Sequence, residues 1–381
     1  MFSAEPVFLE RCNFMNKCDF ELVSKIMTSG EVVNIGEQEI EIKPVPDGDG
    51  KGKMDQREFF IRSAIYAFQK SMPMQFSVEG MRQTTKTYCQ DMCSKEITED
   101  SFDVDVNGRN IKVFSYVLAE KAAEKLPLMI YIHGGSFIAS KAEFYKEPCR
   151  YTAENLGCRV FNIEYSLAPE NLYPAAIEDI CGVIGYISEN ADALNVDKEK
   201  IGLFGDSAGA DLVLAAILDN KSDVKITYAG LFYPCVDLFS RDNLYEWKLD
   251  MYDVDDEQKE LIYSRLQLGR ADGQGNNDLM AAILYAYAGM QYDAIKRSPD
   301  VSPIYADLSN MPTTGIFAAE YDGLRIQAEY YSRLLDKAGI PNKHIRYRGV
   351  SHAFLDYFGI LPQAQAAILE MCDQVRKVWG N

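Results

Sequence analysis

From about residue 100 onward, short runs of apolar residues alternate with longer runs in which apolar residues recur at helical spacing. The short runs are rich in β-branched and aromatic residues, which is typical of buried strands. They predict eight strands, over residues 102–106, 111–118, 128–133, 159–165, 200–205, 226–233, 314–319 and 344–349. The longer runs predict helices over residues 144–156, 175–190, 208–219, 325–338 and 363–378. This alternation predicts an α/β fold, with a mainly parallel eight-stranded sheet and helices on both faces.

Two stretches of the chain do not follow this alternation. Residues 1–95 combine helical patterns with one strand-like pattern at 32–43, and residues 236–300 are a polar, helical insertion between two strands. An insertion of that length is long for a connection, and long loops in compact domains tend to be lids or binding elements. We therefore expect one main domain over residues 96–381, with a helical cap inserted at about 236–300. Residues 1–95 are expected to be an N-terminal extension that contributes to this cap.

Composition and charge exclude several classes of protein. Of the 381 residues, 47% are hydrophobic and 25% are charged, which is ordinary for a globular protein rather than a disordered or fibrous one. The 39 basic and 57 acidic residues give a net charge of −18, whereas nucleic acid and anionic membranes both bind basic surfaces. No apolar run approaches the roughly 18 residues that a membrane span needs. We therefore expect neither a nucleic-acid partner nor a membrane partner.

Nine cysteines are scattered along the chain without a CxxC pair. This pattern is typical of free thiols in a reducing compartment rather than of a zinc site. The first residues include Glu5 and Glu10 and lack the basic start and apolar run of a signal peptide. A soluble, cytoplasmic protein without a bound metal is expected.

The sequence Gly205-Asp206-Ser207-Ala208-Gly209 is a G-x-S-x-G pattern between a predicted strand and a predicted helix. A sharp strand–turn–helix of this kind lifts the serine hydroxyl out of the sheet, and the small flanking residues leave room for the turn. The helix N-terminus also favours developing negative charge. Because a hydroxyl needs an adjacent base to become a nucleophile, Ser207 is a candidate nucleophile if a histidine lies beside it.

The chain has three histidines, His133, His344 and His352. His352 is the favoured base, since it follows the last predicted strand, and loops at the carboxyl ends of parallel strands build sites in open sheets. An acid must orient the imidazole, and Asp322 lies in a turn after the penultimate strand. Glu320, at the end of that strand, is the weaker candidate for this acid. Capping the next helix is an alternative role for Asp322.

A tetrahedral intermediate needs N–H donors that are already in place. One is the N–H of Ala208, directly after the candidate nucleophile. Further donors are available in His133-Gly134-Gly135-Ser136, directly after a predicted strand, because glycines let backbone N–H groups turn inward. The candidate oxyanion residues are therefore Gly134, Gly135, Ser136 and Ala208. A plain glycine turn is the alternative for this segment.

These motifs together resemble the hormone-sensitive-lipase-like family of α/β-hydrolase esterases. HGGS at 133–136 resembles that family's HGGG loop, and GDSAG at 205–209 matches its nucleophile turn. Further blocks in the family's order are YSLAPENLYPAAIED at 165–179, SPIYADLSNMP at 302–312, AEYDGLR at 319–325 and SHAF at 351–354. The resemblance covers about residues 100–381. It implies an α/β-hydrolase catalytic domain over residues 96–381, with a triad of Ser207, His352 and Asp322.

The resemblance also implies the activity and its requirements. It implies a carboxylic ester hydrolase, of the carboxylesterase or acetyl esterase type, that forms an acyl-enzyme from a small-molecule ester with a short acyl chain. It implies no cofactor, and a cap over the acyl pocket. Two departures concern the site: Ser136 replaces the third glycine of HGGG, and Ala210-Asp211 replaces Gly-Asn after the nucleophile turn. The family's oxyanion donors correspond mostly to Gly135 and Ser136.

Other functions stay open on the residues alone. An amidase or peptidase would use the same triad, because both chemistries pass through the same intermediate. A non-catalytic, ligand-binding homologue would keep the pocket without turnover. Residues 47–58 have the length and some acids of a calcium loop, but Lys51 takes a ligand position and no helix enters, so we favour a surface loop. The natural substrate and the oligomeric state also stay open, and a homodimer is one option.

Overall fold

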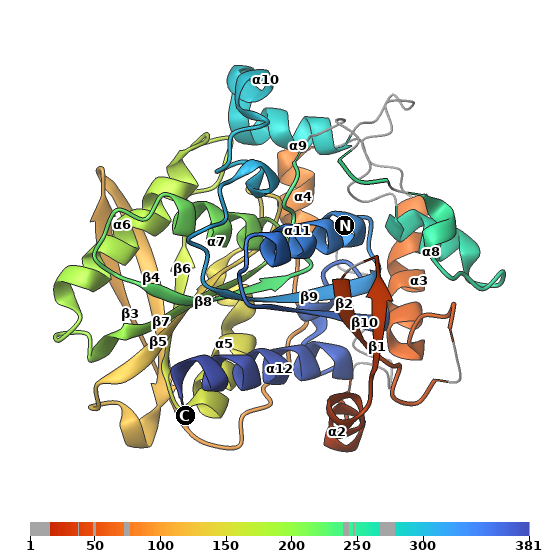
Figure 1. Cartoon of the computed structure of the whole chain (residues 1–381), viewed down its shortest axis with the longest axis horizontal. Coiled ribbons are helices and arrows are strands. Elements are labelled where there is room, and N and C mark those ends of the chain that lie inside the picture. Colours follow the sequence, from red (N-terminus) through yellow and green to blue (C-terminus); the bar gives the residue numbers. More distant parts are fainter. Residues whose placement is uncertain are drawn as a thin grey trace.

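The computed structural model describes residues 16–36, 38–48, 51–71, 77–238, 244–246, 248–266 and 279–380. Its strands are β1 (Glu31–Ile35), β2 (Gln38–Lys43), β3 (Ile97–Val106), β4 (Arg109–Leu118), β5 (Leu126–Ile132), β6 (Arg159–Glu164), β7 (Val196–Asp206), β8 (Ile226–Phe232), β9 (Thr313–Tyr321) and β10 (Asn342–Ser351). They form one ten-stranded sheet in the order β1-β2-β10-β9-β8-β7-β5-β6-β4-β3 (Figure 1).

The middle of the sheet is parallel. Neighbouring strands pair in parallel from β6 through to β2, whereas β1, β3 and β4 pair antiparallel at the two edges. The parallel strands are buried on both faces, as β8 shows with every residue but Thr227 buried. The carboxyl ends of these strands therefore share one edge, where the loops of open α/β sheets build their sites.

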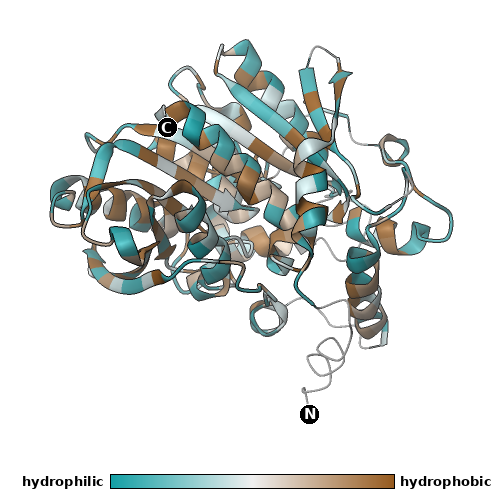
Figure 2. Cartoon of the chain, turned by 90° about the horizontal axis from the view of Figure 1, so that it is seen from below, coloured by the Kyte–Doolittle hydropathy of each residue, from teal (hydrophilic) through white to brown (hydrophobic). Residues whose placement is uncertain are grey.

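Helices cover both faces of the sheet (Figure 1). One face carries α6 (Ala175–Asn190), α7 (Ala208–Leu218) and α11 (Arg325–Lys337), whose apolar sides pack with the sheet into one hydrophobic core. The other face carries α5 (Lys146–Leu156), α12 (Pro362–Trp379) and α2 (Phe20–Thr28), which pack into a second core. Figure 2 shows hydrophobic residues gathered on the strands and on the helix sides that face them. The predicted α/β architecture is confirmed.

The prediction of eight strands is wrong, because the sheet has ten. The strand-like pattern at 32–43 folds as the hairpin β1–β2, which turns at Gly36 with a φ of +66°. β2 then joins the main sheet beside β10. The first predicted strand also starts earlier, at Ile97, since residues 98–101 are exposed on this edge strand and do not show an apolar pattern.

The N-terminal extension and the insertion each supply helices outside these layers. α2, β1 and β2 extend the sheet and one helical layer, but α3 (Gln56–Ser71) packs beside α8 (Lys259–Leu266) of the insertion (Figure 1). The remaining helices of the two segments are α4 (Val78–Thr84), α9 (Leu279–Ala288) and α10 (Tyr292–Ile295). Residues 1–15, 37, 49–50, 72–76, 239–243, 247, 267–278 and 381 lie outside the described residues. No helix within the described residues is long and apolar enough to span a bilayer.

Candidate active site

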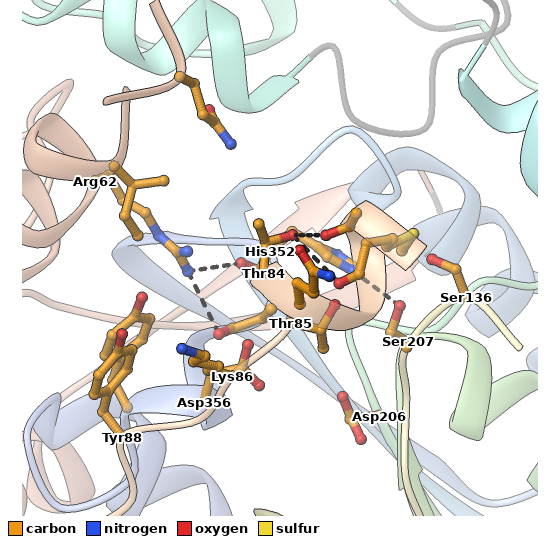
Figure 3. Close-up of a pocket in the computed structure, with 18 of the residues that line it drawn as sticks. Arg62, Thr84, Thr85, Lys86, Tyr88, Ser136, Asp206, Ser207, His352 and Asp356 are labelled. Carbon is orange, nitrogen blue, oxygen red and sulfur yellow. Dashed lines mark hydrogen bonds between the residues drawn. The ribbon is translucent and has the colours of Figure 1, made fainter. Parts of the chain in front are cut away.

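Ser207 occupies the turn between β7 and α7. Its φ of 52° and ψ of −120° lie outside the regions that strands and helices use, so the turn is strained. A Cβ atom at Gly205 would lie 2.6 Å from the carbonyl oxygen of Ile132, and one at Gly209 would collide with the same oxygen. The two glycines therefore permit the turn, which brings the Ser207 side chain to a cavity (Figure 3).

The three predicted triad residues form a continuous chain of hydrogen bonds. Ser207 Oγ lies 2.9 Å from Nε2 of His352 (Figure 3). Nδ1 of His352 lies 2.8 Å from Oδ2 of Asp322. Oδ1 of Asp322 accepts a hydrogen bond of 2.8 Å from the N–H of Leu324, just before α11. The buried carboxylate therefore contacts both the imidazole and the backbone just before α11, although α11 has no side-chain cap of its own.

The order of the strands explains how residues far apart in the chain meet. Ser207 directly follows β7, Asp322 directly follows β9, and His352 directly follows β10. These strands are parallel, with β8 between β7 and β9. Loops at their carboxyl ends therefore lie side by side, as open α/β sheets require.

The other two histidines and Glu320 are not part of this series of hydrogen bonds. His133 is fully buried, which lowers its pKa to about 4. His344 lies in β10, and burial with nearby arginines lowers its pKa to about 3. Oε2 of Glu320 accepts a hydrogen bond of 2.8 Å from the N–H of Gly349. His352 is the histidine that lies beside the serine.

Asp206, the residue before the candidate nucleophile, has a role that sequence reasoning missed. Its buried Oδ1 accepts hydrogen bonds from the hydroxyl of Tyr131 at 2.6 Å and from the N–H of Gly134 at 2.7 Å. The hydroxyls of Tyr145 and Tyr233 donate to its Oδ2 at 3.4 and 3.3 Å. Burial raises the pKa of Asp206 despite these donors. The carboxyl group ties the nucleophile turn to the glycine loop after β5, a link that only the fold creates.

The glycine loop presents two of the predicted oxyanion donors to the cavity. Gly135 and Ser136 line it, and within the described residues their N–H groups have no acceptor. Gly135 has a φ of 114°, which excludes a side chain, whereas Ser136 has a φ of 57°, in the left-handed region that small residues tolerate. The N–H of Ala208 opens α7 and likewise has no helical partner. Gly134 departs from the prediction, because its N–H already donates to the carboxyl group of residue 206.

A buried charged cluster from α3 and α8 holds the backbone of His352. The Nη2 atoms of Arg62 and Arg265 donate to its carbonyl oxygen at 2.9 and 3.2 Å. Glu58 is fully buried and accepts hydrogen bonds from Nε of Arg62 at 2.9 Å and from the N–H of Ser351 at 3.1 Å. Nothing in the sequence pointed to this cluster, because Arg62 and His352 lie 290 residues apart in the chain.

The cavity beside Ser207 and His352 has a volume of about 560 Å³ (Figure 3). Loops at the carboxyl end of the sheet form one wall, and α3, the α4 segment and α8 form the other. Ile65 and Phe68 of α3 and Met81 of α4 supply apolar surface to it. A space of this size suits a small organic ligand.

Asp356 brings a second carboxyl group to the cavity (Figure 3). It accepts a hydrogen bond of 2.9 Å from the hydroxyl of Tyr145. Burial is the main cause that raises the pKa of Asp356 to about 7, and the nearby Asp206 is the second. Near neutral pH this group therefore exchanges between its charged and neutral forms.

The described residues contain no group of three His, Cys, Asp or Glu side chains arranged to hold a metal ion. In the segment 47–58, Arg57 binds the carboxylates of Asp47 at 2.6 Å and Asp55 at 2.9 Å. Asp49 lies outside the described residues. Two acids of the segment that resembled a calcium loop are thus engaged by a guanidinium.

The chain is similar to several known proteins. Residues 129–356 match the family model described as alpha/beta hydrolase fold. An acetyl esterase of Salmonella choleraesuis (strain SC-B67) is 32% identical over 63% of this chain and 69% of that protein. An arylesterase of Saccharolobus solfataricus is 33% identical over 60% of this chain and 68% of that protein. A hyperthermophilic esterase from the archaeon Pyrobaculum calidifontis is structurally similar, with a TM-score of 0.66, 26% identity, and coverage of 86% of this chain and 100% of that one.

Proposed function

The chain belongs to the alpha/beta hydrolase fold family, in the hormone-sensitive-lipase-like group that its motifs resemble, and we propose that it is a serine esterase for short-acyl esters. It is a carboxylic ester hydrolase, like the acetyl esterase and the arylesterase to which it is similar. In the proposal, Ser207 is the nucleophile, His352 is the general base and acid, and Asp322 is the acid that orients the imidazole.

One observation carries this proposal: the hydrogen-bonded series from Ser207 through His352 to Asp322, with distances of 2.9 and 2.8 Å, at the wall of a cavity of about 560 Å³. A serine hydroxyl reacts near neutral pH only when a base within hydrogen-bond reach takes its proton. The series supplies that base, and a buried carboxylate to stabilise the imidazolium.

In the proposed first step, Oγ of Ser207 attacks the ester carbonyl carbon while Nε2 of His352 takes the hydroxyl proton. Asp322 stabilises the charged imidazolium through Nδ1. The tetrahedral intermediate then collapses, and His352 gives its proton to the departing alcohol. An acyl group remains bound to the serine.

The negative charge of the intermediate falls on the former carbonyl oxygen. We propose that the N–H groups of Gly135, Ser136 and Ala208 stabilise it, because Gly135 and Ser136 line the cavity with Ser207 and Ala208 directly follows Ser207 at the start of α7. Among the described residues, these three N–H groups have no acceptor. Water then attacks the acyl-enzyme, with His352 again acting as the base. The products are a carboxylic acid and an alcohol, and the triad returns to its starting state.

We propose that α3, α4 and α8 form the cap over this site. Support comes from the cavity, one wall of which these three elements supply. Only part of residues 1–95 contributes to the cap in this proposal, because α2, β1 and β2 extend the main domain. Residues 96–381 carry the triad, and the insertion at 236–300 contributes α8.

The partner in this proposal is a small-molecule ester, and the name of the related acetyl esterase supports a short acyl chain. We also propose a cytoplasmic location. Every cysteine within the described residues is free, which suits a reducing compartment. Cys12 lies outside the described residues.

Ser207→Ala tests the proposal. We expect the variant to lose hydrolysis of p-nitrophenyl butyrate by about 10⁴-fold or more in kcat, because the attacking group is gone. Ser101→Ala, at an exposed position of β3, is the control and should keep wild-type turnover. A fluorophosphonate should label the wild-type protein and the control, but not Ser207→Ala.

Two results would change the assignment. Undiminished turnover in Ser207→Ala would overturn the serine mechanism. A p-nitroanilide with the same acyl group that is hydrolysed as fast as the ester would turn the assignment towards an amidase, which uses the same triad.

A further inference from the structure

Three cationic side chains line the cavity beside Ser207, although the protein carries a net charge of −18. They are Arg62 of α3, Lys86 just after α4, and Arg265 of α8. Figure 3 shows Arg62 and Lys86 on one side of the cavity and Ser207 on the other. A cationic lining in an acidic protein is a local feature that concentrates anions at the site.

Two of these cations have no carboxylate partner. Arg62 pairs with Glu58 at 2.9 Å, but in the described part of the chain neither Lys86 nor Arg265 forms an ion pair. Among the described residues, Arg265 donates only to neutral oxygens, at 3.1 and 3.2 Å. Burial, together with the nearby Arg62, lowers the pKa of Arg265 to about 10. A desolvated cation of this kind gains from a bound anion, because pairing offsets the cost of desolvation.

The acids of the lining do not supply this anion. Asp206 accepts hydrogen bonds from the hydroxyl of Tyr131 at 2.6 Å and from a backbone N–H at 2.7 Å. Asp356 accepts one from the hydroxyl of Tyr145 at 2.9 Å. Burial raises the pKa of both acids, that of Asp356 to about 7. Each acid is therefore hydrogen-bonded to neutral donors, and in the described part of the chain neither acid forms an ion pair with Lys86 or Arg265.

We propose that the cavity selects esters that carry a carboxylate, which Lys86 and Arg265 bind while the ester carbonyl lies at Ser207. This inference rests on the proposed esterase function and names the substrate class of the same site. The two cations are complementary, since a guanidinium gives parallel hydrogen bonds to a carboxylate and an ammonium gives a compact charge. Thr84 and Thr85, on the same wall, add hydroxyl groups that suit a polar substrate.

The experiment compares matched pairs of anionic and neutral esters. The carboxylate can belong to the acyl part or to the alcohol part, so the first pair is the p-nitrophenyl monoester of adipic acid and the mixed methyl p-nitrophenyl diester of the same acid. The second pair is 4-carboxyphenyl acetate and its methyl ester. Each kcat/KM is divided by the rate of alkaline hydrolysis of the same ester, which removes differences in intrinsic reactivity.

We expect the anionic member of at least one pair to exceed its neutral member by roughly tenfold, the effect of one charge-assisted hydrogen bond. The pair that shows the effect identifies the part of the ester that carries the carboxylate. The ratio should fall as the ionic strength rises from about 0.01 M to about 1 M, over which the Debye length shrinks from about 30 Å to about 3 Å.

Variants connect the effect to the residues. Lys86→Gln should lower the anionic-to-neutral ratio by roughly three- to tenfold. Lys221→Gln removes the same charge beyond the far end of α7 and should leave the ratio unchanged. Arg265→Gln should lower the ratio, whereas Arg265→Lys should keep most of it. Both Arg265 variants can lower kcat/KM for all four esters, because the guanidinium also donates to the carbonyl oxygen of His352. A loss that is equal for the anionic and the neutral ester does not change the anionic-to-neutral ratio.

The outcomes separate this inference from the function on which it rests. Hydrolysis of the neutral esters with ratios of one or less in both pairs overturns the carboxylate preference and leaves the esterase assignment standing. A raised ratio that Lys86→Gln and Arg265→Gln both leave intact also overturns it. Failure to hydrolyse any of the four esters overturns the preference and the esterase assignment together.

Discussion

The two walls of the cavity are built in different ways. On the sheet side, Ser207, Asp322 and His352 stand in loops at the ends of β7, β9 and β10, so strand order brings them together. On the cap side, Arg62 and Arg265 come from helices of the extension and the insertion, and they reach the site as side chains that contact its backbone. The sheet side supplies the groups proposed to react. The cap side holds His352 in place and supplies Lys86 and Arg265, which form no ion pair within the described residues. We therefore expect changes on the two sides to differ in size and kind.

The largest effect after removal of the nucleophile should come from Asp322→Asn, on the sheet side. The amide keeps the shape of the side chain but favours the wrong tautomer of His352 and no longer stabilises its charged form. We expect kcat for p-nitrophenyl butyrate to fall by about 10⁴-fold. Steady-state and single-turnover rates at several pH values measure the loss.

Glu320→Gln is the matched control for this change. Glu320 is also a buried acid, two positions earlier, but its carboxylate accepts a hydrogen bond from the N–H of Gly349 rather than from the imidazole. We expect its amide variant to keep activity within roughly tenfold, since an amide oxygen can still accept that bond. The opposite order, with Glu320→Gln the less active of the two, would contradict the assignment of Asp322.

Glu58→Gln should give an intermediate effect from the cap side. Glu58 accepts hydrogen bonds from Arg62 and from the N–H of Ser351, directly before His352. These contacts hold the loop that carries His352. We expect kcat to fall roughly 10- to 100-fold with little change in KM, because small displacements of a catalytic group are costly. Breaking this buried pair should also lower the free energy of unfolding by about 3 kcal/mol. Kinetics at a temperature where circular dichroism shows a folded variant separates the two effects.

Glu260→Gln is the control on the same side. Glu260 of α8 pairs with Lys70 of α3 in the same way, but both side chains are about two-thirds exposed, at 68% and 67%. Exposed pairs contribute little, so this variant should match the wild-type protein in rate and stability. If both variants lost kcat equally, the rate would depend on the contact between α3 and α8 and not on the contact of Glu58 with the loop of His352.

The sheet side was predictable because its signals are local. A G-x-S-x-G between strand and helix, an aspartate in a turn and a histidine after the last strand each mark the end of a strand, and the parallel order brings such ends together. The α/β architecture and the family were predicted for the same reason. The count of strands was not, because the hairpin turn at Gly36 is hidden within one alternating pattern.

The cap side could not be predicted in this way. Glu58, Arg62 and Arg265 look in the sequence like ordinary charged positions of amphipathic helices. Only the folded chain shows that Glu58 and Arg62 are buried, and that both arginines donate to the carbonyl oxygen of His352. The loss of Gly134 as an oxyanion donor has the same cause, since its partner Asp206 lies 72 residues further along the chain. Pairings of polar groups over such separations leave no periodic pattern to read.

Asp211 belongs to the sheet side, on α7 four residues after Ser207, but it does not line the cavity. Its carboxyl group is fully buried, and neither oxygen has a hydrogen-bond partner within the described residues. Burial is the main cause that raises the pKa of this carboxyl group well above its usual range, and the nearby Asp300 is the second. The folded state therefore keeps a proton that the unfolded chain releases above about pH 4, so this group makes stability fall as the pH rises.

Asp211→Asn should therefore change stability and leave catalysis alone. Relative to wild type, the variant should gain free energy of unfolding as the pH rises above about 4, by at most about 1.4 kcal/mol per pH unit while Asp211 stays protonated. Turnover of p-nitrophenyl butyrate should stay within roughly twofold, because the side chain of Asp211 makes no hydrogen bond to the triad within the described residues. Asparagine also keeps the backbone N–H that donates to the carbonyl oxygen of Ser207 at 3.3 Å. Urea denaturation from pH 4 to pH 8 measures the difference, with the exposed Asp192, whose pKa Lys125 lowers, as an Asn control of opposite sign. A stability difference that does not vary with pH would show that the buried carboxyl is charged in the fold. A large loss of turnover would show that a residue on the sheet side can affect catalysis without a side-chain contact to the triad.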